Sequence, residues 1–397
     1  MAHIVKAQID GIGGRADTLR IRFDRNLNVI WGLNGSGKTT LLRVLNAALS
    51  NDVTSLVGSP VTGASIEIVD NEGRRLTRRY QREQSGLSAQ RRDQIDRAFL
   101  GRDPEVEMNF ATYMALEGML RPEEERTWRT TYHDPDVGHE VGEFGHQYLS
   151  INRLVRGLRG TRPSSAEVDY EASLDEAFSK RVNEQWIHYQ ASSLSEIRVI
   201  QQQGLGRVLS VLFGGPEEKR PPTDFLPTEP DHAYKLTRAF LQDQNIKVNF
   251  NRQSFMQRYQ RERHYAEVVE HIKEVTERVD RALLPQRELE RLVAEFYSGD
   301  KQLSLGRRGI EVRMGRKEIP LRALSSGERQ LLFILLHVMA GGANSVIVDE
   351  PEISLHVDWQ ERLVGTMLTV NPACQLILAT HSPDVMAHVD RRFIHRI

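Results

Sequence analysis

A glycine-rich stretch near the N-terminus has the residue types that bind a chain of phosphates. Residues 32–39 read Gly-Leu-Asn-Gly-Ser-Gly-Lys-Thr, between an apolar segment at 27–31 and a helical pattern at 39–49. In such a loop, backbone N–H groups and the positive end of the following helix face phosphate oxygens. The spacing predicts that Lys38 contacts the β- and γ-phosphates and that the Thr39 hydroxyl binds Mg²⁺. The expected nucleotide-binding residues are Asn34, Gly35, Ser36, Gly37, Lys38, Thr39 and Thr40.

Two carboxylates follow an apolar segment late in the chain. Residues 345–351 read Ser-Val-Ile-Val-Asp-Glu-Pro, so Asp349 and Glu350 come at the end of a predicted strand. A carboxylate there can complete a Mg²⁺ shell, and its neighbour can act as general base on the attacking water. The sequence Asp-Glu-Pro alone is common at a strand-to-turn junction, so its weight comes from occurring together with the glycine-rich loop. We expect Asp349 to bind the metal, and Glu350 and Lys38 to be catalytic.

The segment Leu-Ser-Ser-Gly-Glu at residues 324–328 opens a strongly apolar helical pattern. Ser325 and Glu328 have the spacing of a capping box, in which each side chain satisfies the backbone N–H of the other residue. The structural interpretation and a functional one are compatible, because a capped helix N-terminus with an available hydroxyl also binds phosphate.

His381 follows the predicted strand at 375–378 and precedes Ser382 and Pro383, which are typical of a helix start. A lone histidine is usually an ordinary surface or core residue. At the carboxyl end of a strand in an α/β fold, however, it lies where such folds bind ligands. We therefore count His381 among the catalytic candidates.

In their order along the chain, the four motifs resemble those of ABC-type ATPase domains. The version is the one found in the RecF, SMC and OLD-like AAA-family ATPases of bacteria. The resemblance covers residues 1–50 and 311–390. It implies ATP and Mg²⁺ as cofactors, His381 as a switch histidine at the γ-phosphate, and Glu352–His356 as a D-loop at a dimer seam. It also implies that a head-to-tail ATP dimer forms, in which signature residues meet the ATP of the other subunit. These signature residues are Ser325, Ser326, Gly327 and Glu328.

The sequence departs from transporter domains of the same type in two respects. Ser326 and Glu328 stand where transporters usually have Gly and Gln, and the separation between Lys38 and Ser325 is much longer. The spacing does not fix the Q-loop glutamine. Gln190, at the end of the strand-like segment 186–189, is the candidate for a further Mg²⁺ ligand.

The elements around these motifs predict an α/β fold. Strands are expected at 4–9 and 19–23 and a hairpin at 66–80, and from residue 311 strands and helices alternate. We expect residues 1–84 and 301–397 to form the two halves of an ABC-type P-loop ATPase core. Residues 85–300 would be a mostly helical insertion, with a Pro-rich loop at 214–230 and a long helix at about 255–284 that Pro285 ends or kinks.

Composition excludes several classes of protein. With 397 residues the chain can hold two or three structural units. Its 53 basic and 54 acidic residues give a net charge of −1, which excludes a uniformly cationic nucleic-acid binder. A single cysteine, Cys374, excludes intramolecular disulfides and cysteine-cluster zinc sites. No apolar stretch is long enough to span a bilayer and no signal peptide is evident, so we expect a cytoplasmic protein without membrane contact.

The leading hypothesis is the ATPase and sensor of a bacterial anti-phage defence or DNA-maintenance complex. It would dimerise on ATP and control a separate effector protein, a nuclease or toxin, because only sixteen residues follow His381. The alternative is a RecF-like DNA-clamping repair ATPase. Its DNA contact would be the stretch Arg74–Arg102, with nine Arg and three acids, although such a stretch is more often a solvated surface. A transporter subunit is disfavoured by the long charged insertion.

Overall fold

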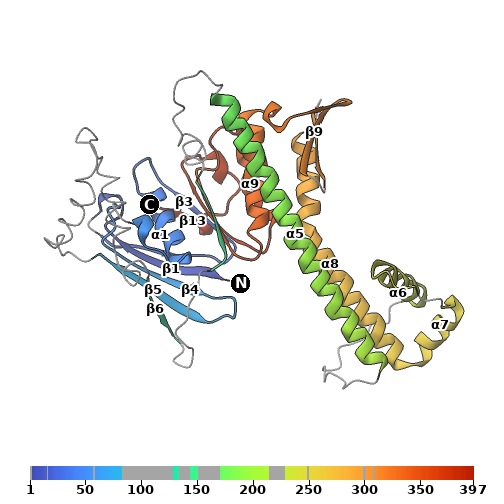
Figure 1. The fold of residues 1–397 in the computed structure, drawn as a ribbon. Coiled ribbons are helices and arrows are strands. Elements are labelled where there is room, and N and C mark those ends of the chain that lie inside the picture. The colour runs from blue at the N-terminus through green and yellow to red at the C-terminus, as the bar shows by residue number, and fades with distance from the viewer. Residues whose placement is uncertain are drawn as a thin grey trace, which may run out of the picture. The chain divides into compact units, whose positions relative to one another are not determined.

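The structure is a computed structural model that describes residues 2–15, 17–56, 59–82, 128–133, 144–150, 170–213, 229–247, 250–297, 301–306 and 309–397. The chain forms two compact units. The first comprises Met1–Val182, Leu292–Leu303 and Glu311–Ile397, and the second Asn183–Arg291 and Ser304–Ile310. The boundary falls inside two long helices, α5 (Tyr170–Leu212) and α8 (Arg263–Phe296), drawn in green and pale orange in Figure 1. The predicted α/β fold with a helical segment is confirmed.

A five-stranded parallel sheet in the first unit has the order β13-β3-β12-β11-β7. Every residue of β11 and β12 is buried, which explains their uninterrupted apolar runs. Asp349 pairs in register with Ala379 on one side and with Ser150 on the other, so the carboxyl ends of neighbouring strands meet at one edge. The strands are β3 (Leu27–Trp31), β7 (His146–Ser150), β11 (Ser345–Asp349), β12 (Gln375–Thr380) and β13 (Ile394–Arg396).

A second sheet of the first unit is antiparallel, with the order β2-β1-β4-β5-β6. Helix α1 (Lys38–Leu49) contacts β4 of this sheet and β7, β11 and β12 of the parallel one, so a single hydrophobic cluster spans both (Figure 1). The predicted strands, hairpin and first helix are confirmed. The strands are β1 (His3–Asp10), β2 (Leu19–Arg22), β4 (Gly63–Val69), β5 (Arg75–Gln81) and β6 (Arg129–Tyr132).

Gln375 joins the two sheets through a buried amide. Its Oε1 accepts hydrogen bonds from the Ile4 N–H (2.9 Å) and the Ser345 hydroxyl (2.9 Å). Its Nε2 donates to the carbonyls of Ile4 (2.7 Å) and Asp24 (2.9 Å). Because Gln375 is fully buried, these bonds fix the start of β12 against β1 with every amide group satisfied.

The remaining elements are two helices of the first unit and a small sheet. Helix α9 (Ser326–Ala340) contacts β7 and α10 (Val357–Val370). A three-stranded sheet has the order β10-β9-β8. Its strands are β8 (Lys301–Gly306), β9 (Gly309–Met314) and β10 (Lys317–Ile319), and the short 3₁₀ helices are Ile12–Gly14, Thr54–Leu56, Leu321–Ala323, Asp384–Met386 and Arg391–Phe393.

The second unit is built on α5 and α8, which run side by side (Figure 1). A Cβ on Gly204 of α5 would lie 2.1 Å from Val275 Cγ2 of α8, so the two backbones approach closely there. Ile200, Val208 and Ile272 belong to the apolar cluster between them. Helices α6 (Pro230–Asp243) and α7 (Arg252–Arg261) complete this unit.

The ends of the helix expected in this region are wrong, and Pro285 does not end it. The helix predicted at 255–284 is two helices, because Glu262 adopts an extended conformation (φ −115°, ψ 113°) between α7 and α8. Pro285 lies inside α8, which continues to Phe296, and the buried side chains of Leu289 and Leu292 beyond it offset the lost backbone hydrogen bond. Most of the Pro-rich loop, residues 214–228, lies outside the described residues.

The region predicted as an insertion also contains core strands. β6 and β7 lie between residues 85 and 300, yet they belong to the first unit and pair with β5 and β11.

Two expectations from composition can be compared with the structure. Burial raises the pKa of the Cys374 thiol to about 12, which fits an unreactive cysteine. No helix of the described segments is both long and apolar enough to cross a membrane.

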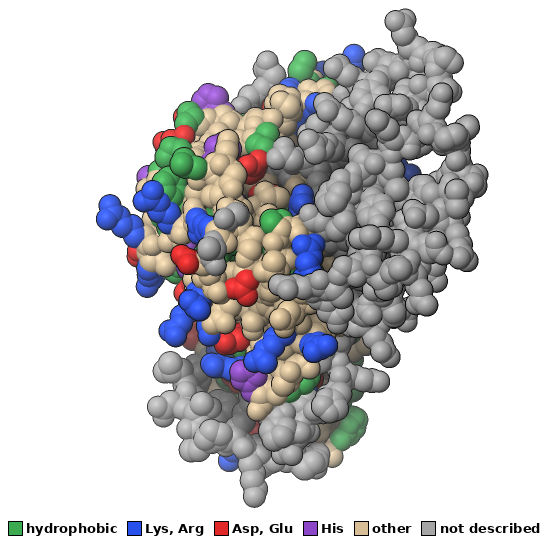
Figure 2. Space-filling model, turned by 90° about the vertical axis from the view of Figure 1, so that its left-hand side faces the viewer, with side chains coloured by type: hydrophobic (Ala, Val, Ile, Leu, Met, Phe, Trp, Pro, Cys, Tyr) green, Lys and Arg blue, Asp and Glu red, His purple; other side chains and the backbone are tan. Residues whose placement is uncertain are grey.

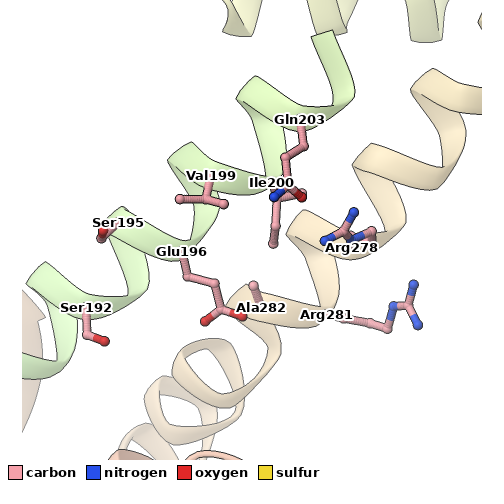
Figure 3. Close-up of a pocket in the computed structure, with 9 residues that line it drawn as sticks. All are labelled: Ser192, Ser195, Glu196, Val199, Ile200, Gln203, Arg278, Arg281 and Ala282. Carbon is pink, nitrogen blue, oxygen red and sulfur yellow. The ribbon is translucent and has the colours of Figure 1, made fainter. Parts of the chain in front are cut away.

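A groove of about 850 Å³ runs along α5 and α8 (Figure 3). Glu196 and Gln203 line it from α5 and Arg278 from α8, with Val199 and Ile200 as apolar residues. None of the residues expected to bind nucleotide lines this groove.

Candidate nucleotide-binding site

The glycine-rich loop leaves β3 and enters α1 at Lys38. Gly37 is the N-cap of α1 with φ +101°, and a Cβ there would lie 2.9 Å from Ile12 Cγ1, so only glycine fits. Lys38 is 5% exposed, and its Nζ donates to the carbonyls of Gly32 (2.8 Å) and Leu33 (3.1 Å). The ammonium group is therefore held inside the loop, on the side where phosphates would bind.

Asp349 ends β11 next to this loop. Its carboxylate is hydrogen-bonded to the Thr39 side chain, and the residue is 3% exposed. Burial raises the pKa of Asp349 to about 6, and the charge of Glu350 adds to the rise. The Thr39 hydrogen bond and the positive charges of Arg43 and Lys38 oppose it without cancelling it.

These groups fit a bound cation. The Oδ1 atom of Asp349 is buried and has no hydrogen-bond partner among the described residues. A hard cation such as Mg²⁺ prefers oxygen ligands and would supply the missing partner. Thr39 and Asp349 are the residues that would hold it. Within the ranges given above, no three His, Cys, Asp or Glu side chains gather into a metal cluster, so further ligands would come from phosphates and water.

Glu350 has a left-handed backbone conformation (φ +53°), which is uncommon for a non-glycine residue. Its N–H donates to the Ala379 carbonyl at 2.8 Å, which fixes the turn against the end of β12. Its Oε1 lies 3.8 Å from His381 Nδ1. The structure thus brings together the predicted base and the predicted switch histidine, which are far apart in the sequence.

The signature segment forms the predicted capping box. Ser325 Oγ accepts from the Glu328 N–H (3.2 Å), and Glu328 Oε2 accepts from the Ser325 N–H (2.6 Å) and from Lys301 Nζ (2.9 Å). Burial alone would raise the pKa of Glu328, but these hydrogen bonds outweigh it and lower the pKa. A Cβ on Gly327 would lie 2.7 Å from the Ser354 carbonyl oxygen, so the signature helix packs tightly on the expected D-loop of its own chain.

Gln190 lies in an element of a different kind from the one expected. Segment 186–189, expected as a strand, lies with Gln190 inside α5 in the second unit. Trp186 and Tyr189 stack at 6.0 Å as neighbours one helical turn apart, and the Trp186 indole donates to the Gly306 carbonyl. The short aromatic run suggested a strand, but its buried positions follow a helical period. Without the strand, the assignment of Gln190 as a metal ligand loses its basis.

Two residues beside Asp349 were missed. Ser150 ends β7 as the register partner of Asp349, and only this long-range pairing identifies it. Arg43 lies one turn after Thr39 on α1, and its charge acts on Asp349. The i, i+4 spacing from Thr39 was the signal that could have found Arg43.

Sequence comparison places the chain in a family. Residues 27–387 match the family described as "AAA domain, putative AbiEii toxin, Type IV TA system". The chain belongs to this AAA domain family. The resemblance to the RecF, SMC and OLD-like group of ABC-type ATPases is thereby confirmed.

Individual relatives of this AAA domain chain are distant. The "Retron Vc95 probable ATPase" of Vibrio cholerae serotype O1 biovar El Tor is 27% identical over 120 residues, which cover 26% of this chain and 23% of that protein. The match thus spans about a quarter of the relative's length. Among solved structures, the Smc head domain with an extended coiled coil, bound to the C-terminal domain of ScpA and derived from Pyrococcus furiosus, has a TM-score of 0.42, 14% identity and coverage of 98% and 92% of the two chains. The SMC head domain from Thermotoga maritima has a TM-score of 0.40, 13% identity and coverage of 99% and 94%.

Proposed function

We propose that this chain binds and hydrolyses ATP with Mg²⁺ at the carboxyl edge of its parallel sheet. One observation supports this most: Lys38 and Thr39, Asp349 and Glu350, and His381 follow three adjacent strands, β3, β11 and β12, at the same edge. Ligands bind at this edge in open α/β sheets. Membership of the AAA domain family and the name of the retron relative agree with an ATPase.

Each residue has a distinct task in this proposal. Lys38 exchanges the two loop carbonyls for phosphate oxygens, while the N–H groups at the start of α1 receive the phosphate chain. Bound Mg²⁺ supplies neutralisation of charge on the β- and γ-phosphates. Glu350 accepts a proton from the attacking water, and His381 contacts the γ-phosphate.

The direct test is ATP binding and hydrolysis by purified variants. Lys38→Ala should lose nucleotide binding, measured with a fluorescent ATP analogue, because its ammonium contacts the phosphates. His381→Ala should affect both ATP binding and ATP hydrolysis. Its binding defect should be smaller than that of Lys38→Ala. If Lys38→Ala binds ATP as tightly as the wild type, the site lies elsewhere.

We further propose that two chains share each ATP head to tail, with the signature helix of one chain closing the loop of the other. The tight packing of Gly327 on the D-loop supports this proposal, because the signature helix and the D-loop would then meet the other chain as one rigid surface. Lys38→Ala and Gly327→Arg chains should each be inactive alone, and mixing them should restore one complete site per heterodimer. Confirmed heterodimers that remain inactive at every mixing ratio would exclude sharing.

The biological role that we propose is the sensor and ATPase of a defence or DNA-maintenance complex that controls a separate effector. The family description, which includes a putative toxin and a type IV toxin–antitoxin system, and the retron relative support this role. Co-purification with products of adjacent genes, and phage plaque counts with and without Lys38→Ala, test it. Normal defence by a strain carrying Lys38→Ala would exclude an ATP-dependent role.

A DNA-clamping function is the second candidate, and the antiparallel sheet favours it in a specific way. On the sheet face opposite the core, Lys6 pairs with Glu67 at 3.2 Å, and five exposed arginines surround this pair. The arginines are Arg20, Arg22, Arg75, Arg79 and Arg129. Figure 2 shows Lys and Arg side chains interspersed with Asp and Glu over the coloured part of the face in view.

The Arg-rich stretch contributes less to this surface than its composition suggests. Arg74 pairs with Asp70 at 2.7 Å, and Arg78 is fully buried beneath the sheet, where it donates to the Ala48 and Leu49 carbonyls. Residues 83–102 lie outside the described residues.

A double variant tests whether the sheet surface binds DNA. Duplex binding, measured by fluorescence anisotropy, should weaken about tenfold or more when Arg79→Glu and Arg129→Glu are combined. It should not weaken in the control Arg316→Glu.

A further inference from the structure

A single buried carboxylate oxygen gathers the polar groups of the loop that follows β12. Glu352, in the turn after β11, is 5% exposed. Its Oε1 accepts from the Thr380 hydroxyl (2.6 Å) and from the N–H groups of His381 (3.0 Å) and Ser382 (3.3 Å). The Nδ1 atom of His381 lies 3.1 Å from the same oxygen. Glu352 thus contacts both the backbone and the ring of the histidine.

These contacts fix the proton on the ring. Backbone N–H groups only donate, so Glu352 Oε1 acts as an acceptor, and Nδ1 of His381 must carry a proton to approach it. The carboxylate of Glu350 lies 3.8 Å from the same Nδ1, beyond hydrogen-bond distance, and its negative charge favours the same tautomer. Nε2 is then the ring nitrogen that neither carboxylate engages, and the side chain is 46% exposed.

The second oxygen of Glu352 indicates why this residue is an acid. Oε2 is buried and has no hydrogen-bond partner among the described residues, so half of the carboxylate is unsatisfied. A glutamine oxygen could accept from the same backbone N–H groups and hydroxyl at a smaller cost of burial. The feature that an amide lacks is the negative charge, and the group beside it that can respond to charge is the imidazole ring.

We propose that Glu352 is a positioning residue that orients His381 through its charge and joins the turn after β11 to the loop after β12. Gln360 of α10 provides a second connection, since its Oε1 accepts from the Ser382 hydroxyl (2.8 Å) and its Nε2 donates to the Leu355 carbonyl (2.9 Å). A displacement of the segment 351–355 is therefore transmitted to His381. This inference rests on the proposed ATPase site.

Charge and shape are separated by two variants. Glu352→Gln keeps an oxygen for the backbone donors and removes the charge, whereas Glu352→Ala removes both. We expect Glu352→Gln to lower kcat for ATP by about 10- to 100-fold, as loss of a group that orients a site ligand does, with KM changed less than about threefold. Glu361→Gln, an exposed acid on α10, is the matched control and should hydrolyse ATP like the wild type. If Glu352→Gln retains the wild-type kcat and only Glu352→Ala loses it, the residue is merely structural and the proposal is overturned.

A second measurement does not depend on hydrolysis. The ¹⁵N shifts of the His381 ring, assigned with His381→Gln and recorded without nucleotide at alkaline pH, should show the proton on Nδ1 in the wild type and a shift toward Nε2 in Glu352→Ala. A wild-type ring with its proton on Nε2 would overturn the proposal. If the wild type has no ATPase activity, the proposed function fails, and the ring shifts still decide whether Glu352 orients His381.

Discussion

The substitution Asp349→Asn should stabilise the metal-free protein while removing its metal ligand. Burial raises the pKa of Asp349 from 3.8 to about 6, a difference of about two units, and each unit corresponds to about 1.4 kcal/mol. Because the folded-state value is the higher one, the folded protein binds this proton more tightly. The associated stability is complete below pH 4 and is lost as the pH rises through 6. Asparagine carries no charge and avoids this cost. The free energy of unfolding of the Asp349→Asn protein should therefore exceed that of the wild type by about 3 kcal/mol at pH 8 and by about half as much at pH 5.

Urea unfolding with EDTA, followed by tryptophan fluorescence, measures this difference, since Trp31, Trp128 and Trp359 lie in the first unit. Asp17→Asn, an exposed acid of the same unit, is the control and should change little. Adding Mg²⁺ and ATP should stabilise the wild type and not Asp349→Asn. The reasoning is refuted if Asp349→Asn is less stable than the wild type at pH 8 without metal, or if its gain is the same at pH 5 and pH 8.

Three further substitutions test the catalytic base, the Gln375 hydrogen bonds that join the two sheets, and the packing of the signature helix at Gly327. Glu350→Gln should bind ATP normally and hydrolyse it at least about 100-fold more slowly in a phosphate-release assay, because an amide cannot accept the proton; a wild-type rate would exclude it as the base. Gln375→Glu turns a buried donor into an acceptor facing two carbonyls and should lower the free energy of unfolding by about 3 kcal/mol in urea, whereas a loss below about 0.5 kcal/mol would contradict the network. Gly327→Ala should lower the thermal midpoint because its Cβ meets the Ser354 carbonyl at 2.7 Å, while Gly365→Ala, with open space around it in α10, should not.

Local patterns predicted the parts of this fold that depend on neighbouring residues. The loop at 32–39, its flanking strand and helix, and the capping box of Ser325 and Glu328 are set by backbone geometry within a few positions. β7 was missed because its assignment depends on pairing with β11, nearly two hundred residues later. The break at Glu262 has no glycine or proline to announce it, whereas Pro285 falls where packing on both sides keeps α8 continuous.

The candidate site divides in the same way. Residue types and spacing indicated Lys38, Thr39, Asp349, Glu350 and His381, because each belongs to a recognisable motif. The link from the turn after β11 to the loop after β12 could not be predicted, since it joins segments about thirty residues apart through one side-chain oxygen. Contacts of this kind are specified by tertiary packing and leave no periodic signal in the sequence.

The order of strands in the parallel sheet has a consequence for how the protein is made. β3, which carries the phosphate loop, lies between β12 and β13, so both of its neighbours come from residues 375–396. During synthesis the phosphate loop therefore emerges early. β3 can pair with its neighbouring strands only after residues 375–396 have been synthesised. The helices of the second unit depend on nearer partners and can fold first, because contacts close in sequence form faster. A chain that ends before residue 375 lacks both neighbours of β3, so it cannot assemble the site.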